Sequence, residues 1–281
     1  MDWIGPAPAL CELEKVKPLH STKISPLEEA VQLEADVLRG KIQHFTGKFS
    51  DAKKLLERVV GMIHHPERSA PSRAIAHLSA VCCELGEYEQ GIRYAESHLS
   101  PGEYSPNSMN ERRLRLALAS AYLVKAMWIV RSVLPSDVPP NNAHDVLHKA
   151  QEILEGLNAY NPAKLSRADK INRVSICLGL AIIAHLQRKF VTALQWYESV
   201  LSASSECGWA SGYVEAMTLS SMSVILHTTK DVSQAEKYER QALSIYQERS
   251  FYFVGFGTLW PEIVGRWLKR LGRGTIVMSD T

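Results

Sequence analysis

The apolar and polar positions divide the chain into helix-like stretches that are separated by tight polar turns or by runs rich in proline. No stretch alternates with a period of two for long enough to predict a strand. We therefore predict an all-α protein. The expected helices span residues 25–46, 50–64, 72–85, 88–99, 111–134, 143–157, 166–187, 190–204, 212–228, 233–247 and 259–271.

Four of the turns are followed by one large-then-small pattern. A bulky residue opens the next helix and a tiny residue follows three positions later, as in Phe49/Ala52, Tyr88/Gly91, Phe190/Ala193 and Val232/Ala235. The residue four places further on lies on the same helical face, and these residues are Leu56, Ala95, Tyr197 and Glu239. A small residue on that face lets two antiparallel helices approach closely, so we expect the small residues to be buried between paired helices.

The pattern recurs at the spacing of a helical repeat protein. Ala52 and Gly91 are 39 residues apart, and Ala193 and Ala235 are 42 apart. Repeats of roughly 34 to 47 residues are typical of α-solenoids, which bury their core by stacking neighbouring hairpins. The sequence predicts three regions: an irregular N-terminal arm at 1–24, about five hairpins at 25–250 with a proline-rich insertion at 135–142, and an aromatic C-terminal cap and tail at 251–281.

The turn, bulky residue and small residue resemble the tetratricopeptide repeat family. The match is best around Gly40-Gly47-Phe49-Ala52 and around Phe190-Ala193-Tyr197. The other repeats differ from the family pattern: Val232 stands where the family has an aromatic residue, Gly91 stands where it has alanine, and the insertion at 135–142 replaces its short turn. The pattern is therefore degenerate, and it covers about two thirds of the chain. The resemblance implies a right-handed superhelix of antiparallel hairpins, capped by the C-terminal helix, whose first helices line a concave groove that binds protein or peptide partners.

In such arrays the positions five and eight before the bulky turn residue are expected to face the groove. The fifth positions are His44, Cys83, His185 and His227, and the eighth are Lys41, Ala80, Ile182 and Val224. The expected groove is polar in its first half and apolar in its second. Its residues are Glu34, Lys41, His44, Arg73, Cys83, Glu84, Leu178, Ile182, His185, Val224 and His227.

Three functions fit this surface. The leading interpretation is a non-enzymatic binding scaffold for a protein or peptide. The second is a helical protein that encloses a small apolar ligand, with His185 or His227 as an acid or base, because imidazole titrates near neutral pH. The third is a regulatory subunit of a larger assembly. Histidines at these positions are also common as ordinary half-buried residues, so the deciding feature is whether the surface is open or sealed by the two ends of the chain.

Composition narrows the partners. With 281 residues, 46% hydrophobic and 22% charged, the chain can bury a large core, and its net charge of +2 gives no general attraction to nucleic acid or to an anionic membrane. The longest nearly apolar run, 177–186, is about half of the ~20 residues that span a bilayer. Five cysteines and no secretory signal predict a reducing compartment, cytosolic or nuclear, and no disulfide framework.

Motifs for a cofactor or a metal are weak. Gly255-Phe256-Gly257 lacks the third glycine of a dinucleotide loop, and His144 and His148 lack the acid of a zinc-protease helix. We therefore expect neither a cofactor nor a metal. Two basic patches are expected to be solvated helix faces, or else to bind an acidic partner: Arg112, Arg113 and Arg115, and Arg266, Lys269, Arg270 and Arg273. Trp260 and Trp267, one heptad apart, are expected in the cap or in a homodimer interface.

Overall fold

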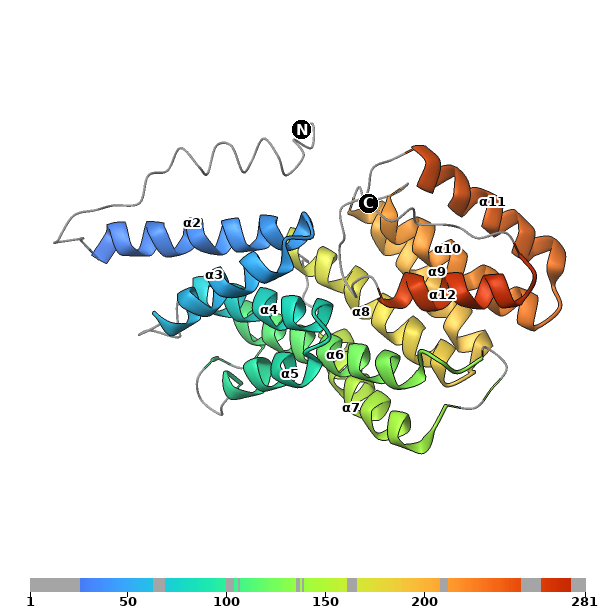
Figure 1. Ribbon diagram of the computed structural model, residues 1–281, viewed down its shortest axis with the longest axis horizontal. Coiled ribbons are helices and arrows are strands. Elements are labelled where there is room, and N and C mark those ends of the chain that lie inside the picture. The colour runs from blue at the N-terminus through green and yellow to red at the C-terminus, as the bar shows by residue number, and fades with distance from the viewer. Residues whose placement is uncertain are drawn as a thin grey trace. The chain divides into compact units, whose positions relative to one another are not determined.

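The computed structural model describes residues 26–62, 69–99, 104–105, 107–134, 137, 139–160, 166–207, 212–248 and 259–273. These residues form helices and no strand, which confirms the all-α prediction (Figure 1). The N-terminal arm at 1–24 lies outside them. The helices are α2 (Pro26–Phe45), α3 (Phe49–Gly61), α4 (Ser69–Glu84), α5 (Tyr88–Ser97), α6 (Met109–Val130), α7 (Asn141–Asn158), α8 (Arg167–Leu186), α9 (Phe190–Glu206), α10 (Tyr213–Thr228), α11 (Val232–Glu248) and α12 (Leu259–Arg270).

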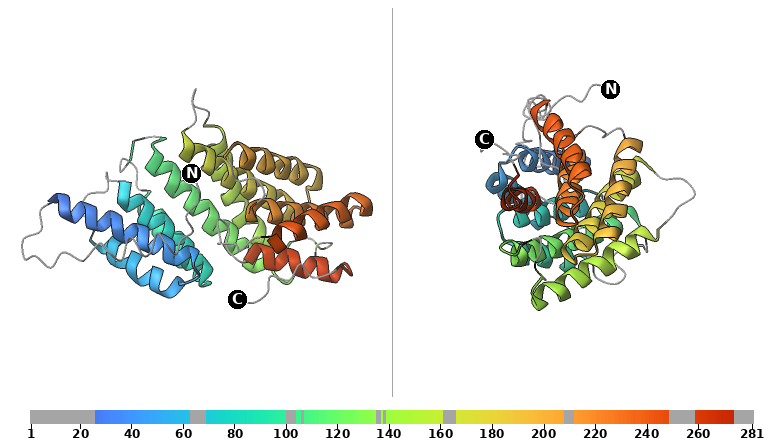
Figure 2. Two further views of the ribbon diagram at one scale, coloured as in Figure 1. Left: turned by 90° about the horizontal axis from the view of Figure 1, so that it is seen from above. Right: turned by 90° about the vertical axis from the view of Figure 1, so that its right-hand side faces the viewer.

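The chain divides into two compact units, Met1–Ala121 and Tyr122–Thr281, and the boundary falls within α6. In unit 1, α2 packs on α3 and α4 on α5, and α4 also contacts α2 and α3. Figure 2 shows these helices, coloured blue to teal, side by side. In unit 2, α8 packs on α9 and α10 on α11, while α7 contacts α8 and α9 contacts α10. Each unit therefore consists of helices that pack in pairs, and the pairs contact one another.

One turn geometry joins the helices of all four hairpins. The residue two places before the bulky residue has a positive φ: 76° at Gly47, 77° at Gly86, 60° at Arg188 and 69° at Lys230. The amide of the following residue then donates to the carbonyl five residues earlier, with N···O distances of 2.8 to 2.9 Å. This is the Schellman arrangement, which satisfies helix-terminal carbonyls through one left-handed residue. The four turns are thus structural repeats, although two of them lack glycine.

The small residues are buried within the hairpins, as predicted. Ala52, Ala193 and Ala235 are completely inaccessible, and Gly91 is buried. A Cβ atom on Gly91 would lie 2.8 Å from the Ser79 carbonyl oxygen, so only glycine allows α5 this close to α4. The Ser79 hydroxyl uses the proximity and donates to the Gly91 carbonyl at 2.9 Å. The large-then-small pattern therefore marks the positions at which the two helices of a hairpin are in contact.

The proline-rich insertion changes the middle pair. The backbones of α6 and α7 do not approach as closely as those of the other four hairpins. They meet through longer side chains, and the Lys149 ammonium lies over the Tyr122 ring, 5.5 Å from its centre.

The C-terminal helix α12 is built into unit 2. Its apolar stripe is buried, with Trp260 completely inaccessible and Trp267 only 4% exposed. α12 packs against α10, and its two indoles reach the ring of His185 on α8. It therefore covers the first helices of two hairpins. Across the helices that the structure describes, none has the length and apolar character needed to cross a membrane.

Candidate functional site: a basic cluster on the first helices of unit 1

Three cations from three helices meet in unit 1, and we call them, with two neighbouring imidazoles, the basic cluster. Lys41 comes from α2, Arg73 from α4 and Arg113 from the first half of α6. The imidazoles belong to His44 on α2 and His77 on α4. Lys41 and His44 are three residues apart, and Arg73 and His77 four apart, so each pair occupies one face of its helix.

Ring contacts and hydrogen bonds tie the basic cluster together. The rings of His44 and His77 meet edge to face with centres 6.2 Å apart. Phe45 lies 6.2 Å from His77, and the Lys41 ammonium stands 5.5 Å from the centre of the Phe45 ring. At the other side, Arg113 Nη1 donates to Ser72 Oγ at 3.0 Å and to Asn110 Oδ1 at 3.2 Å. Since Ser72 adjoins Arg73, these hydrogen bonds place Arg113 beside the α4 part of the basic cluster.

Most of this charge is not compensated. Arg73 forms an ion pair with Glu34. In the part of the chain that the structure describes, neither Lys41 nor Arg113 has a carboxylate partner. The Arg73 Nε is buried and has no acceptor among the described residues. Half-buried cations of this kind are unfavourable unless a counter-charge reaches them.

The pKa values of the cluster reflect burial and mutual repulsion. Burial lowers the pKa of the Lys41 ammonium, and the Arg113 guanidinium lowers it further. Burial, and then Arg73, lower the pKa of Arg113. The pKa of His77 is far below its usual value because His77 is desolvated and faces His44, Lys41, Arg113 and Arg73. Burial is the larger cause of each shift, and the smaller contribution from neighbouring cations shows that the cluster's positive groups repel one another.

The His44 ring packs edge to face against Phe49 of its own hairpin partner α3, with ring centres 5.9 Å apart. The His44 side chain is buried, at 6% exposure, and its Nδ1 has no hydrogen-bond partner in the structure. Burial lowers its pKa to about 4. At neutral pH the ring is therefore uncharged and can offer one donor or one acceptor, depending on its tautomer.

Two other expectations for unit 1 need correction. Cys83 does not line the first-helix surface, because it is buried and its Sγ lies 3.2 Å from the position of a Cβ on Gly91, between α4 and α5. Burial raises the pKa of its thiol. The patch at 112–115 is not a wholly solvated face either: Arg112 is buried and Arg113 half-buried, and only Arg115 is exposed. Glu34 lies beside the basic cluster as the partner of Arg73, and Glu84 is half-buried at the end of α4.

The histidine expected in the groove of unit 2 is enclosed by an aromatic cluster. The ring of His185 lies 5.4 Å from Trp260, 5.2 Å from Trp267, and 6.1 Å from both Tyr197 and Phe190. His185 Nδ1 and the Tyr197 hydroxyl share a hydrogen bond of 3.2 Å. The expectation that this side chain projects away from its hairpin is wrong, since it is 3% exposed and bonded to the partner helix α9. Burial lowers its pKa to about 3.

The second candidate histidine of unit 2 also contacts its own hairpin partner. His227 Nε2 lies 2.7 Å from Glu239 Oε1 on α11, and its side chain is only 4% exposed. Ser223 Oγ donates to the same carboxylate oxygen at 3.2 Å. His227 therefore joins α10 to α11 and does not present its ring on an open surface.

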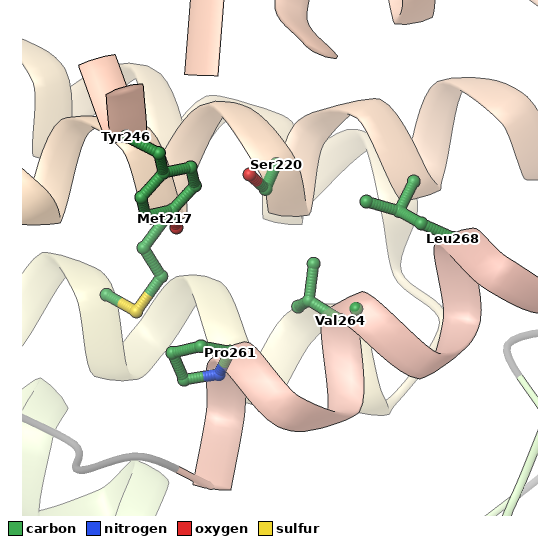
Figure 3. A pocket seen from close by; sticks show the side chains of 7 residues that line it. Met217, Ser220, Tyr246, Pro261, Val264 and Leu268 are labelled. Atoms are coloured by element: carbon green, nitrogen blue, oxygen red, sulfur yellow. The ribbon is translucent and has the colours of Figure 1, made fainter. Parts of the chain in front are cut away.

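The apolar residues expected beside these histidines are buried as well. Leu178, Ile182 and Val224 have at most 2% exposure. Elsewhere in unit 2, side chains of α10, α11 and α12 line a cavity of about 20 Å³ (Figure 3). Met217, Ser220 and Tyr246 face Pro261, Val264 and Leu268 across it. A cavity of this size holds about one water molecule and no organic ligand.

His77 was not identified from the sequence, and Arg113 was placed in a basic patch and not among the residues of the first-helix surface. The spacing of Arg73 and His77 on one face of α4 was a usable signal. Arg113 could not be reached by counting back from a turn, because the proline-rich insertion replaces the turn after α6. Its position follows only from the contact between α6 and Ser72 of α4.

No protein-family model matches the sequence, and no curated protein matches it either.

Proposed function

We propose that the protein is a non-enzymatic interaction module that binds an acidic segment of a partner protein on the basic cluster of unit 1. In this proposal the hairpins form a right-handed superhelix like that of tetratricopeptide repeats, and the first helices α2, α4 and α6 provide the binding surface. The observation that carries it is the group of two half-buried cations, Lys41 and Arg113, without a carboxylate partner in the described chain.

Electrostatics supports an acidic ligand. Removing a cation from water without pairing it costs several kcal/mol in general terms, and two neighbouring cations repel each other as well. A carboxylate-bearing peptide would restore the lost solvation by charge-assisted hydrogen bonds. Peptide grooves that read acidic motifs through clustered basic residues are one of the recurring modes of peptide recognition.

The small-ligand alternative has less support. His185 is sealed beneath two indoles and is uncharged at neutral pH, and His227 is engaged by Glu239. The cavity beside α12 has room for about one water molecule. A role as the regulatory subunit of a larger assembly remains compatible with the basic cluster, since a subunit would use the same surface for its acidic partner.

Peptide selection tests the proposal directly. A displayed library of random peptides is selected on the wild-type chain and on the double variant Lys41→Met/Arg113→Gln. We expect peptides rich in Asp and Glu from the wild type, and about tenfold or greater loss of their affinity in the double variant, because each charge-assisted hydrogen bond contributes about 1.5 to 3 kcal/mol.

A matched control variant separates the effect of losing the basic cluster from the effect of lowering the net charge of the protein. Lys54→Met/Arg93→Gln removes the same two charges from exposed positions on α3 and α5. Affinity for the selected peptides should be unchanged in this variant. If the control loses as much affinity as the cluster variant, or if no acidic peptides are enriched, the proposed function is wrong.

A further inference from the structure

We infer that the basic cluster recognises a phosphate monoester, carried on a serine or threonine side chain of the partner, in preference to a carboxylate. This inference rests on the proposed function and specifies its ligand. Three features of the basic cluster carry it: the number of unpaired charges, the supply of free donors, and the engagement of the neighbouring carboxylates.

The charge count favours a dianion. Of the three cations, Arg73 is paired with Glu34, whereas Lys41 and Arg113 have no counter-charge in the described residues. The unpaired charge is therefore about +2, because both neighbouring imidazoles are neutral near pH 7. A phosphate monoester carries about −1.5 to −2 charges at pH 7 and would balance it, while one carboxylate would leave a cation uncompensated.

The donors also suit a tetrahedral group. Arg73 Nε is buried without an acceptor, so one N–H beside the Glu34 ion pair is available. Lys41 contributes an ammonium that lies over the Phe45 ring and has no ion-pair partner among the described residues. Arg113 keeps further N–H groups beyond the Nη1 that bonds Ser72 and Asn110. Arginine and lysine donors from separate helices can reach different oxygens of a phosphate, whereas a planar carboxylate offers only two.

Two acidic side chains on the helices that carry the basic cluster are already engaged. Asp36 on α2 accepts from Arg39 and Arg58, and Glu111 on α6 pairs with Arg115. Moving either of them to the basic cluster would break an existing ion pair. An external anion can satisfy Lys41 and Arg113 at no such cost.

The test uses the full chain with inorganic phosphate as probe, titrated at pH 7.5 and constant ionic strength by calorimetry. We expect saturable binding to the wild type, at least about tenfold weaker binding to Lys41→Met and to Arg113→Gln, and no change in Lys54→Met/Arg93→Gln. In phosphate-free buffer the Lys41→Met chain should melt at a higher temperature than the wild type, because an unpaired, desolvated cation is gone.

Two outcomes would overturn the inference: phosphate binding that is identical in all variants, or a lower melting temperature of Lys41→Met in phosphate-free buffer. The latter would show that Lys41 holds the fold together through its contact with Phe45.

A peptide arm separates this inference from the proposed function. One acidic peptide from the selection is made with serine, glutamate or phosphoserine at a central position, and each version is titrated against the wild type and Lys41→Met. We expect the phosphoserine version to bind most tightly, with its advantage lost in Lys41→Met. If the glutamate version binds as well as the phosphoserine version, the phosphate inference fails and the proposed function stands. If phosphate binds at the cluster but no peptide does, the proposed function fails.

Discussion

Besides the imidazole of His77, those of His44 and His185 are held in the neutral form by burial, and this makes the stability of the protein depend on pH. Their pKa values fall from 6.5 to about 4 and about 3 in the folded chain. Between those values and 6.5 the unfolded chain binds more protons than the folded chain. The contribution of these histidines to the free energy of unfolding is therefore greatest above pH 6.5. It decreases as the pH falls, by about 1.4 kcal/mol per pH unit for each such histidine.

Urea unfolding at pH 5.0, 5.5, 6.0 and 6.5 measures this dependence. In His185→Gln the titrating ring is absent while an amide can still bond Tyr197, so the slope of stability against pH should be shallower than in the wild type by about 1.4 kcal/mol per unit. His148→Gln, at an exposed position of α7, is the control and should keep the wild-type slope. Equal slopes in the wild type and His185→Gln would mean that His185 is not buried as a neutral ring.

Individual residues show where prediction from sequence succeeded and where it stopped. The small residue of each hairpin was identified because its spacing from a bulky neighbour reflects a contact between adjacent helices. The direction in which the side chains of His185 and His227 point was not identified. A side chain on a helix can face either neighbouring helix, and which one it faces depends on partners that are distant in the sequence. For His185 those partners are Trp260 and Trp267, more than seventy residues away. Lys41 and Arg73 were both predicted for the surface of the first helices, and the structure brings their helices α2 and α4 into contact.

At the scale of elements, the helices were predictable to within a few residues because turns and prolines mark their ends. The pairing of α6 with α7 was predicted as one of about five hairpins, and Lys149 of α7 does contact the Tyr122 ring of α6. The turns of the other hairpins share a left-handed residue, but only two of the four use glycine. Arg188 and Lys230 therefore hold a conformation that costs a side-chain-bearing residue roughly 1 to 2 kcal/mol.

Replacing these residues should stabilise the protein. Arg188→Gly and Lys230→Gly each relieve left-handed strain while keeping the turn hydrogen bonds to His185 and His227 carbonyl oxygens. We expect a gain of about 1 kcal/mol from each, measured by urea unfolding. Lys189→Gly is the matched control: its φ is −81°, so glycine there relieves no strain and should reduce stability. A loss of stability in both turn variants would show that the side chains of Arg188 and Lys230 contribute more than their backbone costs.

At the scale of the whole molecule, the two units treat their first helices differently. In unit 1 this surface carries uncompensated charge, and we assign partner binding to it. In unit 2 it is covered by the chain's own C-terminal helix, whose indoles donate to Ser221 Oγ at 3.0 Å and to the Val133 carbonyl at 2.9 Å. Trp260 and Trp267 are consequently buried within one chain, and a homodimer through the aromatic C-terminal segment stays a prediction. The neighbouring aromatic residues Phe251, Phe253 and Phe256 lie outside the described residues.

Removing both indoles should therefore expose the interior of unit 2. In Trp260→Ala/Trp267→Ala, His185, Ser221 and the apolar face of α10 lose their cover. Large-to-small changes of a buried tryptophan cost about 3 to 5 kcal/mol, which is a large share of the stability of an ordinary domain. We expect a lower melting temperature, strong binding of a hydrophobic dye, and self-association in sedimentation experiments. Lys269→Ala/Arg270→Ala, on the exposed side of the same helix, should leave all three measurements close to the wild type. If the tryptophan variant stays monomeric and melts with the wild type, α12 is not part of the core of unit 2, and the surface around His185 must be reconsidered as an open site.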